Sequence, residues 1–195
     1  TDSGNVTVTG NQVATTNANN GVIDMDTLRV DGTVALTTHG DGNATIVNDD
    51  DINFATSIVR GNLSATATTN DITDTGTLTI SGTSTFTTSQ SDADITLGSV
   101  NVFTGAVALN TSGSTGNAEV NNGTTALIIA ASTEACNRTL TSGAAESMID
   151  SYNITVTGNL IATTNANSGL INMGTLRVDG TMALTTDGDV HATIV

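Results

Sequence analysis

The sequence predicts an all-β fold, a parallel β-helix (β-solenoid) in which short strands wind around one axis. Three observations support this. Apolar residues recur at every second position, as in residues 28–36, which is the period of a β-strand. A glycine stands in the middle of each such stretch, and a Thr-Thr pair ends it. The unit returns about every 22 residues, and such a period indicates a solenoid.

Within one unit, alternation assigns each side chain to a face. Leu28, Val30, Val34 and Leu36 are predicted to point inward, and Thr33 outward. The central glycine lies between two short strands, where missing bulk permits a bend. The Thr-Thr pairs are expected to form a ladder of hydroxyls down one corner. The residues predicted to have these structural roles are Gly10, Gly32, Gly82, Gly105, Gly158, Gly180, Thr15, Thr37, Thr87, Thr163 and Thr185.

A third short strand follows each Thr-Thr pair, so the sequence predicts three short strands per turn. We expect about eight turns of roughly 21–29 residues each, because the glycine spacing stretches between Gly32 and Gly61. The gap from Gly105 to Gly158 is too long for one unit, so another turn is expected around residues 126–130, with its glycine replaced. Residues 132–152 are the least regular part. A barrel or sandwich is the alternative, but it gives no reason for a fixed period.

A longer repeat lies above the short one. Residues 2–47 return as residues 150–195, at an offset of 148 positions. The changes between the copies keep the character of each position: Val34 becomes Met182, whereas Asp24 becomes Asn172. We therefore expect one solenoid segment over residues 1–195, part of a longer array or filament. Six turns in one such repeat would give about 25 residues per turn.

Charge excludes two classes of partner. The net charge is −15, and all four basic residues are arginine. Such a chain repels phosphate backbones and anionic lipid, so neither nucleic-acid binding nor membrane insertion is expected. No apolar run approaches the roughly 20 residues of a membrane span. The single cysteine, Cys136, excludes an intrachain disulfide and is predicted to be a small buried hydrophobe; an interchain bridge is the alternative.

Acidic turns are the candidate metal sites, because Ca²⁺ prefers six to eight oxygen ligands. No complete calcium-loop motif is present, so solvated turns are the favoured interpretation and no cofactor is expected. The candidate residues are Asp49, Asp50, Asp51, Asp92, Asp94, Asp187 and Asp189. His39 and His191 occupy unmatched positions and are interpreted as loop residues.

Two alternative functions remain open. Arg29 beside Asp31, repeated as Arg177 beside Asp179, could act on a polysaccharide, although the chain lacks aromatic platforms and the pairs are better explained as surface ion pairs. Thr-x-Thr strings such as residues 7–9 could bind ice, but the aligned arginine and aspartate interrupt a flat hydroxyl face. No catalytic set is present, and the chain is not expected to be an enzyme.

The string Gly76–Thr88 resembles the repeats of large bacterial surface and secreted proteins of the filamentous-haemagglutinin (adhesin) type. This resemblance implies a right-handed β-helical shaft, exported by its producer and used for adhesion or extracellular scaffolding. A cell-surface glycan or protein receptor is then a candidate partner.

Self-association is the other expected partnership. The chain begins and ends inside a repeat, which predicts further copies in the same chain or end-to-end stacking of subunits. The net charge of −15 is expected to limit side-by-side contact while leaving end-on growth possible.

Overall fold

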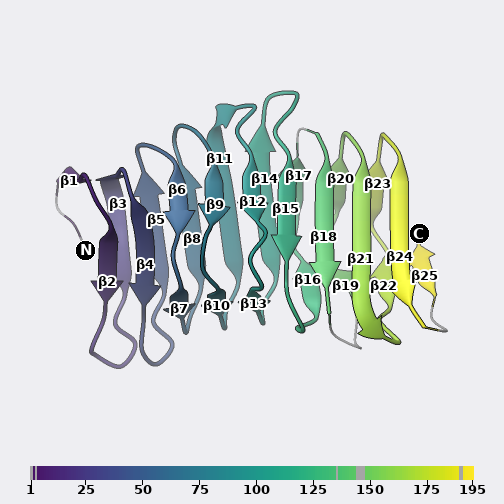
Figure 1. Cartoon of the computed structure of the whole chain (residues 1–195), viewed down its shortest axis with the longest axis horizontal. Coiled ribbons are helices and arrows are strands. Elements are labelled where there is room, and N and C mark those ends of the chain that lie inside the picture. Colours follow the sequence, from purple (N-terminus) through teal and green to yellow (C-terminus); the bar gives the residue numbers. More distant parts are fainter. Residues whose placement is uncertain (1, 3, 135, 144–147, 189–190) are drawn as a thin grey trace.

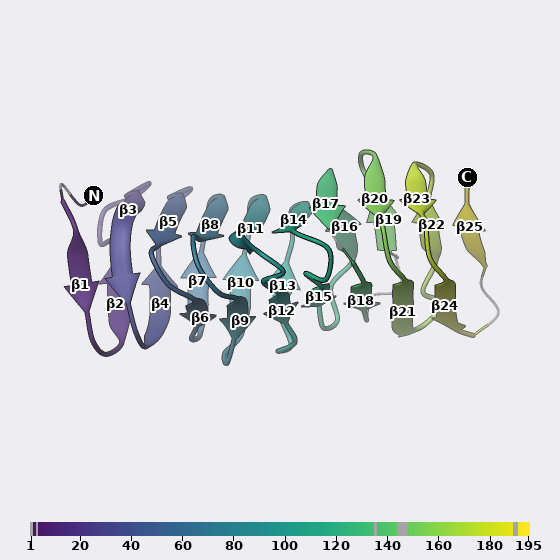
Figure 2. The same ribbon diagram turned by 90° about the horizontal axis from the view of Figure 1, so that it is seen from above.

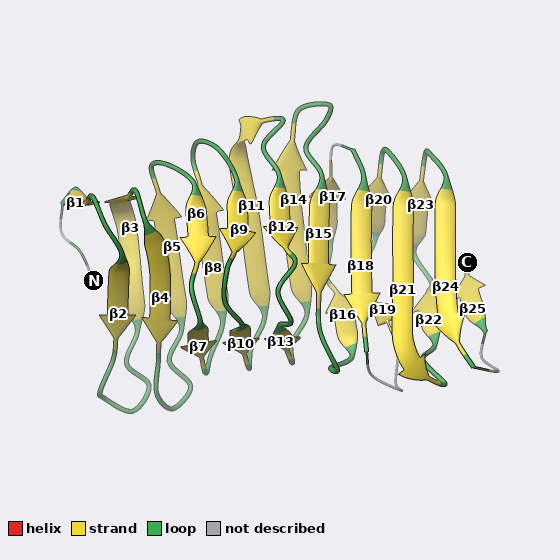
Figure 3. Cartoon of the chain, in the orientation of Figure 1, coloured by secondary structure: helices red, strands yellow, loops and turns green. Residues whose placement is uncertain are grey.

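A computed structural model describes residues 2, 4–134, 136–143, 148–188 and 191–195. Every regular element in this part of the chain is a β-strand, and its strands pair in parallel (Figure 3). The strands form two sheets that face each other across a narrow core (Figures 1 and 2). The predicted parallel β-solenoid is therefore confirmed.

Among the described residues, sheet A contains 13 strands. They are β1 (Val6–Val8), β3 (Ile23–Val30), β5 (Ala44–Asn48), β8 (Leu63–Ala67), β11 (Ser84–Ser91), β14 (Val107–Ser112), β16 (Leu127–Ile129), β17 (Ser132–Glu134), β19 (Met148–Asp150), β20 (Ile154–Val156), β22 (Ile171–Met173), β23 (Leu176–Val178) and β25 (Ala192–Ile194).

Sheet B contains 12 strands in the part of the chain that the structure describes. They are β2 (Gln12–Thr15), β4 (Thr33–Thr37), β6 (Ile52–Phe54), β7 (Ser57–Val59), β9 (Ile72–Asp74), β10 (Leu78–Ile80), β12 (Ile95–Leu97), β13 (Val102–Phe103), β15 (Ala118–Asn121), β18 (Arg138–Ser142), β21 (Leu160–Asn167) and β24 (Met182–Asp187).

We call the part of a sheet that one turn contributes a level. The described strands of sheet B occupy nine levels, from β2 to β24, and eight full turns separate the first level from the last. In Figure 1 the near strands run downward, the far strands run upward and the chain advances from left to right, so the winding is right-handed. The turn from Asn43 to Asn62 advances the chain by 19 positions, and the turn from Asp94 to Asn117 by 23. The expected upper limit of roughly 29 residues per turn was therefore too long.

The core follows the predicted alternation. Leu28, Val30, Val34 and Leu36 are all buried, whereas Thr33 lies on the outer surface of sheet B. Each inward residue stacks on the inward residue of the next level, because the parallel register aligns them.

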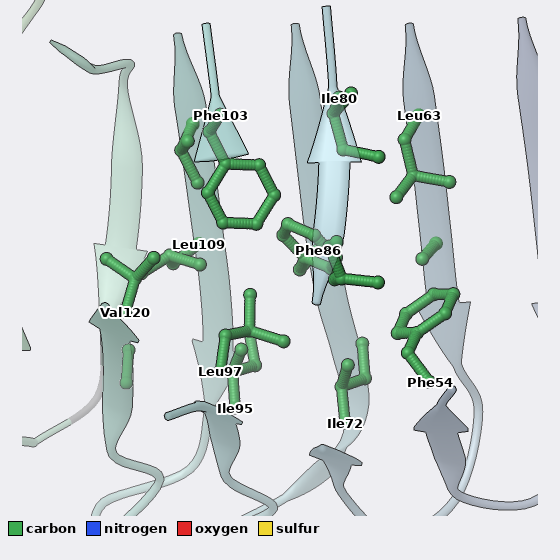
Figure 4. Close-up of a cluster of buried hydrophobic side chains, with 14 of the residues drawn as sticks. Phe54, Leu63, Ile72, Ile80, Phe86, Ile95, Leu97, Phe103, Leu109 and Val120 are labelled. Atoms are coloured by element: carbon green, nitrogen blue, oxygen red, sulfur yellow. The ribbon is translucent and has the colours of Figure 1, made fainter. Parts of the chain in front are cut away.

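The three phenylalanines lie together in the middle of the stack. Phe86 of sheet A has its ring centroid 6.1 Å from that of Phe54 and 5.9 Å from that of Phe103, both of sheet B (Figure 4). Both contacts are edge-to-face, an arrangement that aromatic rings prefer. These rings link the two sheets across the core.

The three strand segments of a turn do not form three sheets. Most turns place one continuous strand in one sheet and two short strands, separated by a kink, in the other; the turns formed by β4 and β5 and by β14 and β15 have a continuous strand in both sheets. The kinked pairs lie in sheet B at β6/β7, β9/β10 and β12/β13, but in sheet A at β16/β17, β19/β20 and β22/β23. The β3 strand is kinked in the same way, with a register shift between Met25 and Leu28. The kinked side of the solenoid therefore changes sheet twice.

Each change of sheet is a half-turn shift of the repeat. The chain makes one and a half turns between Gly32, after β3 in sheet A, and Gly61, after β7 in sheet B. The same happens between Gly105, after β13, and Cys136, after β17. The long repeat, from Gly10 before level one of sheet B to Gly158 before level eight, thus contains seven turns. The expectation of six turns was wrong because two long spacings, Gly32–Gly61 and Gly105–Cys136, were each counted as one turn although each spans one and a half.

Candidate functional site

The corner glycines are sites of close approach between neighbouring turns. A Cβ atom at Gly32 would lie 2.5 Å from the carbonyl oxygen of Gly10, so no side chain fits there. The amide of Gly82 donates to the carbonyl of Gly61, and that of Gly180 to Gly158, each at 3.0 Å.

Cys136 occupies the corner where the regular glycine is missing. The amide of Gly158 donates to the Cys136 carbonyl at 2.8 Å, as Gly180 does to Gly158 one turn later. The predicted extra turn between Gly105 and Gly158 is present, and its replaced glycine is this cysteine. Cys136 is half-buried and forms no disulfide. The corner therefore exposes part of a side chain that was predicted to be buried.

The two threonines of a Thr-Thr pair lie in different places. The first, such as Thr37 or Thr163, points to the outer surface. At Thr38 and Thr164 the second is buried and closes the turn: Thr38 Oγ1 donates to the Gly42 carbonyl at 2.8 Å, and Thr164 Oγ1 to the Gly169 carbonyl at 3.0 Å.

The expected single hydroxyl ladder is not formed by the described strands. Thr15 aligns with Thr37 in sheet B, but the next residue in that column is Ile58. Thr87 lies in sheet A, and Thr163 aligns with Thr185 in sheet B. The half-turn shifts break the ladder into short pieces on alternating sheets.

Asparagines that follow the corner residues form a second kind of ladder. Asn137 Oδ1 accepts the amide of Asn159 at 2.9 Å, and Asn159 Oδ1 accepts that of Thr181 at 2.8 Å. At the other edge, Asn43 Oδ1 accepts the amide of Asn62 at 2.8 Å. In the sequence this asparagine ladder corresponds to a recurring Gly-Asn dipeptide, which was not among the predicted structural residues.

The acidic turns bind mainly to the protein's own backbone. Asp92 Oδ1 accepts the amides of Ser114 and Thr115 at 2.7 and 2.9 Å, and these hydrogen bonds lower the Asp92 pKa. Asp94 Oδ1 accepts the amide of Asn117 at 2.7 Å. These carboxylates fasten one level to the next.

The remaining candidate carboxylates lie nearby or at the far end. Burial and the neighbouring Asp50 raise the Asp51 pKa, whereas Asp49 is largely exposed. Asp187 ends β24, and Asp189 lies outside the described residues. Within the part of the chain that the structure describes, no three histidine, cysteine or acidic side chains are grouped so that they could hold a metal ion.

Arg29 stands among three carboxylates on the surface. Its guanidinium nitrogens lie 3.6 Å from Asp31, 3.9 Å from Asp49 and 3.5 Å from Asp50. A shallow hollow of about 350 Å³ lies over it. Its internal copy, Arg177, contacts Asp179 at 2.9 Å and is mostly exposed. Both are exposed ion pairs, which contribute little to stability.

The two histidines are exposed, as expected for loop residues. His39 Nδ1 contacts the carbonyl oxygen of Thr16, and His191 lies just before β25.

The two half-turn shifts are built by the same pair of polar side chains. At the first junction, Asn48 Oδ1 accepts the amide of Val30 at 2.8 Å and its Nδ2 donates to the Val30 carbonyl at 3.2 Å. Ser57 Oγ accepts the amide of Leu36 at 3.1 Å. These side chains replace the backbone partners that Val30 and Leu36 lose where a kinked level meets a continuous one.

The second junction repeats this arrangement in the opposite sheets. Asn122 Oδ1 accepts the amide of Phe103 at 2.7 Å, and its Nδ2 donates to the same residue's carbonyl at 3.1 Å. Ser132 Oγ accepts the amide of Leu109 at 3.1 Å. Asn122 and Ser132 follow Asn48 and Ser57 by about half of the long repeat. The long repeat therefore consists of two halves of three and a half turns each.

The second junction also holds a buried ion pair. Glu134 Oε1 lies 3.0 Å from Arg138 Nη2, and both side chains are fully buried. Arg138 Nη2 also donates to Ser132 Oγ at 3.2 Å. Among the described residues, neither Glu134 oxygen, nor Nε or Nη1 of Arg138, has a hydrogen-bond partner.

Burial dominates the protonation of this pair. It raises the pKa of Glu134 to about 7, against the opposing charge of Arg138, and lowers the pKa of Arg138. The first junction has Val59 and Leu63 at the equivalent positions, half of the long repeat earlier, and both are buried. The alternation of the sequence predicts that Glu134 and Arg138 point inward. It does not show that the two side chains lie next to each other and form an ion pair.

The fold and its corners define a repeat protein, a right-handed β-solenoid with two sheets. A family model described as repeats of unknown function (DUF5649) matches residues 41–110, which contain Asn48 and Ser57 of the first junction and the levels at which sheet B is kinked. None of the curated proteins matches the chain, and none of the solved structures does. The matched family agrees with a β-helical repeat.

Among the described residues, no helix is long and apolar enough to span a membrane.

Proposed function

We propose that this chain is a structural shaft segment of an extracellular fibre or surface adhesin of the filamentous-haemagglutinin type. It acts by length and stiffness and carries no enzymatic activity. Its partners are further repeats of the same chain or other copies joined end to end. A surface glycan or protein receptor binds elsewhere on the fibre.

The observation that supports this proposal best is the recurrence of one junction in two orientations. Asn48 and Ser57 at the first junction, and Asn122 and Ser132 at the second, make equivalent hydrogen bonds to backbone groups. A recurring arrangement of this kind maintains a continuous stack. Asn137 is likewise bonded between levels, because its amide donates to Asn117 Oδ1 at 3.2 Å.

The stack also suits a load-bearing role. Parallel ladders connect each level to the next along both sheets, and the levels advance by about 4.8 Å, so eight turns span roughly 40 Å. A turn of the same geometry can be added wherever the repeat continues, because each level offers its backbone groups to the next.

Electron microscopy of the purified protein, together with the full reading frame of its gene, tests the proposal. We expect rods or fibres, or flanking export and anchoring segments around further copies of the long repeat. Discrete particles of 19.5 kDa from a gene that encodes nothing more would contradict it.

An activity assay tests the same proposal from the other side. We expect no turnover of acidic polysaccharides. Turnover that Arg29→Ala or Asp31→Asn abolishes would replace the structural role with an enzymatic one. An ice-recrystallisation assay separates the ice-binding alternative.

A further inference from the structure

Seven Asn-x-Ser/Thr triplets occur in the chain, and this triplet is the acceptor motif for N-linked sugars. Asparagine and threonine are so abundant here that the triplets alone do not distinguish acceptor sites from chance matches. The structure separates them, because an acceptor needs an exposed asparagine whose Nδ2 is not required by the fold. The seven asparagines are Asn5, Asn43, Asn62, Asn110, Asn122, Asn137 and Asn153.

Four of these asparagines are exposed, and each directly precedes a strand of sheet A. They are Asn5 before β1, Asn43 before β5, Asn62 before β8 and Asn153 before β20. The third residue of each triplet then lies on the outer surface of that strand; Thr45 and Ser64, for example, are register partners on β5 and β8. All four triplets therefore face solvent on the same side of the solenoid.

At the corners, the exposed asparagines connect neighbouring levels through their side-chain oxygen. Asn43 Oδ1 accepts the amide of Asn62 at 2.8 Å, and Asn62 Oδ1 accepts the amide of Thr83 at 2.9 Å. An N-linked sugar is joined to Nδ2 instead. A sugar on Asn43 or Asn62 therefore leaves the hydrogen bonds between levels intact.

The other three asparagines are closed to such a modification. Asn122 is fully buried, and its Nδ2 donates to the Phe103 carbonyl at 3.1 Å. Asn137 Nδ2 donates to Asn117 Oδ1 at 2.9 Å, and Asn110 is half-buried within β14. A sugar on Asn122 or Asn137 would break a hydrogen bond between levels, so the fold protects these triplets.

We propose that the exposed triplets of sheet A are acceptor sites for N-linked sugars, so that carbohydrate coats one side of the solenoid. The donor is a glycosyl diphosphate, and a transferase of the producing cell catalyses the step. The asparagine Nδ2 attacks C1 of the sugar, and the bond between C1 and the diphosphate oxygen breaks. The diphosphate leaves with the electron pair, and a base of the transferase takes the proton from Nδ2.

The spacing of the acceptors sets how many sugars fit. Asn43 and Asn62 lie on neighbouring levels about 4.8 Å apart, which is too close for two sugar chains, so one of the two is modified in each molecule. Asn153 lies in the kink between β19 and β20, several levels away, and is modified independently.

Peptide mapping by mass spectrometry, on the protein isolated from the cells that produce it, tests the proposal. We expect a sugar on Asn153 and on either Asn43 or Asn62, with none on Asn122 or Asn137. Unmodified asparagine at Asn43, Asn62 and Asn153 would overturn the inference. Equal occupancy of the exposed and the closed triplets would overturn it as well.

A reaction in vitro tests whether the fold itself selects the sites. Unmodified protein from a host without N-glycosylation is incubated with a triplet-specific N-glycosyltransferase and UDP-glucose. Addition at Asn43 should be about tenfold faster than at Asn137, because Asn137 must first give up its hydrogen bond to Asn117. Short peptides that contain the two triplets should react at similar rates, and a difference that persists in the peptides would contradict selection by the fold.

Matched variants assign the sugar to its triplet. Thr45→Ala removes the triplet of Asn43 but keeps the Asn43 hydrogen bond, so it should abolish addition at Asn43 without changing the thermal melt. Thr139→Ala removes the triplet of Asn137 at an equally half-buried strand position and should leave the total sugar unchanged. Addition at Asn43 that survives Thr45→Ala would contradict the assignment.

This inference goes beyond the proposed function and fails separately from it. Fibres whose exposed triplets carry no sugar would contradict only the inference. Glycosylated single particles that form no fibres would contradict only the proposed function.

Discussion

The two junctions of this solenoid solve the same backbone problem with different cores. Asn48 and Ser57 at the first, and Asn122 and Ser132 at the second, make the same hydrogen bonds to backbone groups. The buried pair beside them differs. It is Val59 with Leu63 at the first junction and Glu134 with Arg138 at the second.

This difference separates what the half-turn shift requires from what it tolerates. Buried amide and carbonyl groups must find partners, so the asparagine and the serine recur. The inward pair behind them fills space, and either two aliphatic side chains or an ion pair can do so. Buried ion pairs often stabilise no better than apolar residues of similar volume.

The largest expected effect comes from breaking the ion pair on one side. At a pH above about 7, where Glu134 is ionised, Glu134→Val should lower the free energy of unfolding by about 3–5 kcal/mol, because it leaves the Arg138 guanidinium buried without a counter-charge. Urea melts measure the loss.

The double variant Glu134→Val/Arg138→Leu is the matched control. It copies the first junction and should be as stable as the wild type, or more stable by about 1–4 kcal/mol. A double variant as unstable as the single one would show that the second junction needs its charges.

The ion pair should also make the two junctions differ in pH dependence. The folded-state pKa of Glu134 is raised to about 7, above its ordinary value of 4.5. The folded protein then binds this proton more tightly than the unfolded chain, so the stabilisation is fully present below about pH 4.5 and is lost as the pH rises through about 7.

Unfolding free energies of the wild type and the double variant between pH 4 and pH 8 isolate this contribution, because other groups cancel. Relative to the double variant, the wild type should lose up to about 3 kcal/mol across that range. A difference that stays constant, or grows with pH, would show that the carboxylate is ionised in the fold throughout.

A smaller effect should be equal at both junctions. Asn48→Ala and Asn122→Ala each leave a buried amide and a buried carbonyl unpaired, so each should cost about 2–3 kcal/mol. Asn62→Ala is the control at an exposed corner and should cost less than about 1 kcal/mol. Clearly unequal losses for Asn48 and Asn122 in urea melts would disprove the equivalence of the junctions.

The smallest effect distinguishes the two serines. Ser57→Ala should cost about 1 kcal/mol, since the Leu36 amide loses its acceptor. Ser132→Ala should cost more, because Ser132 Oγ also accepts from Arg138. In the Glu134→Val/Arg138→Leu background the two losses should become equal in urea melts; a persistent gap would assign the extra cost to another contact.

The sequence by itself determined the strand period, the inward and outward faces and the repeat, and with them the parallel β-solenoid. Leu28, Val34 and Leu36 are buried as predicted, because alternation is a local property of the backbone. The extra turn was also predicted, around residues 126–130, but its corner lies at Cys136, because a corner is identified by the residue stacked on it in the next turn.

Only the tertiary structure decided which sheet each unit joins. The sequence around Gly32 and Gly61 looks alike, yet the first corner leads from sheet A to sheet B and the second leads back. The half-turn shifts and the pairing of Glu134 with Arg138 both follow from that choice. The physical reason is the range of the interactions. Alternation depends on neighbouring residues, whereas each turn forms hydrogen bonds to partners 19 to 23 positions away. A local pattern therefore does not predict which residues pair between turns.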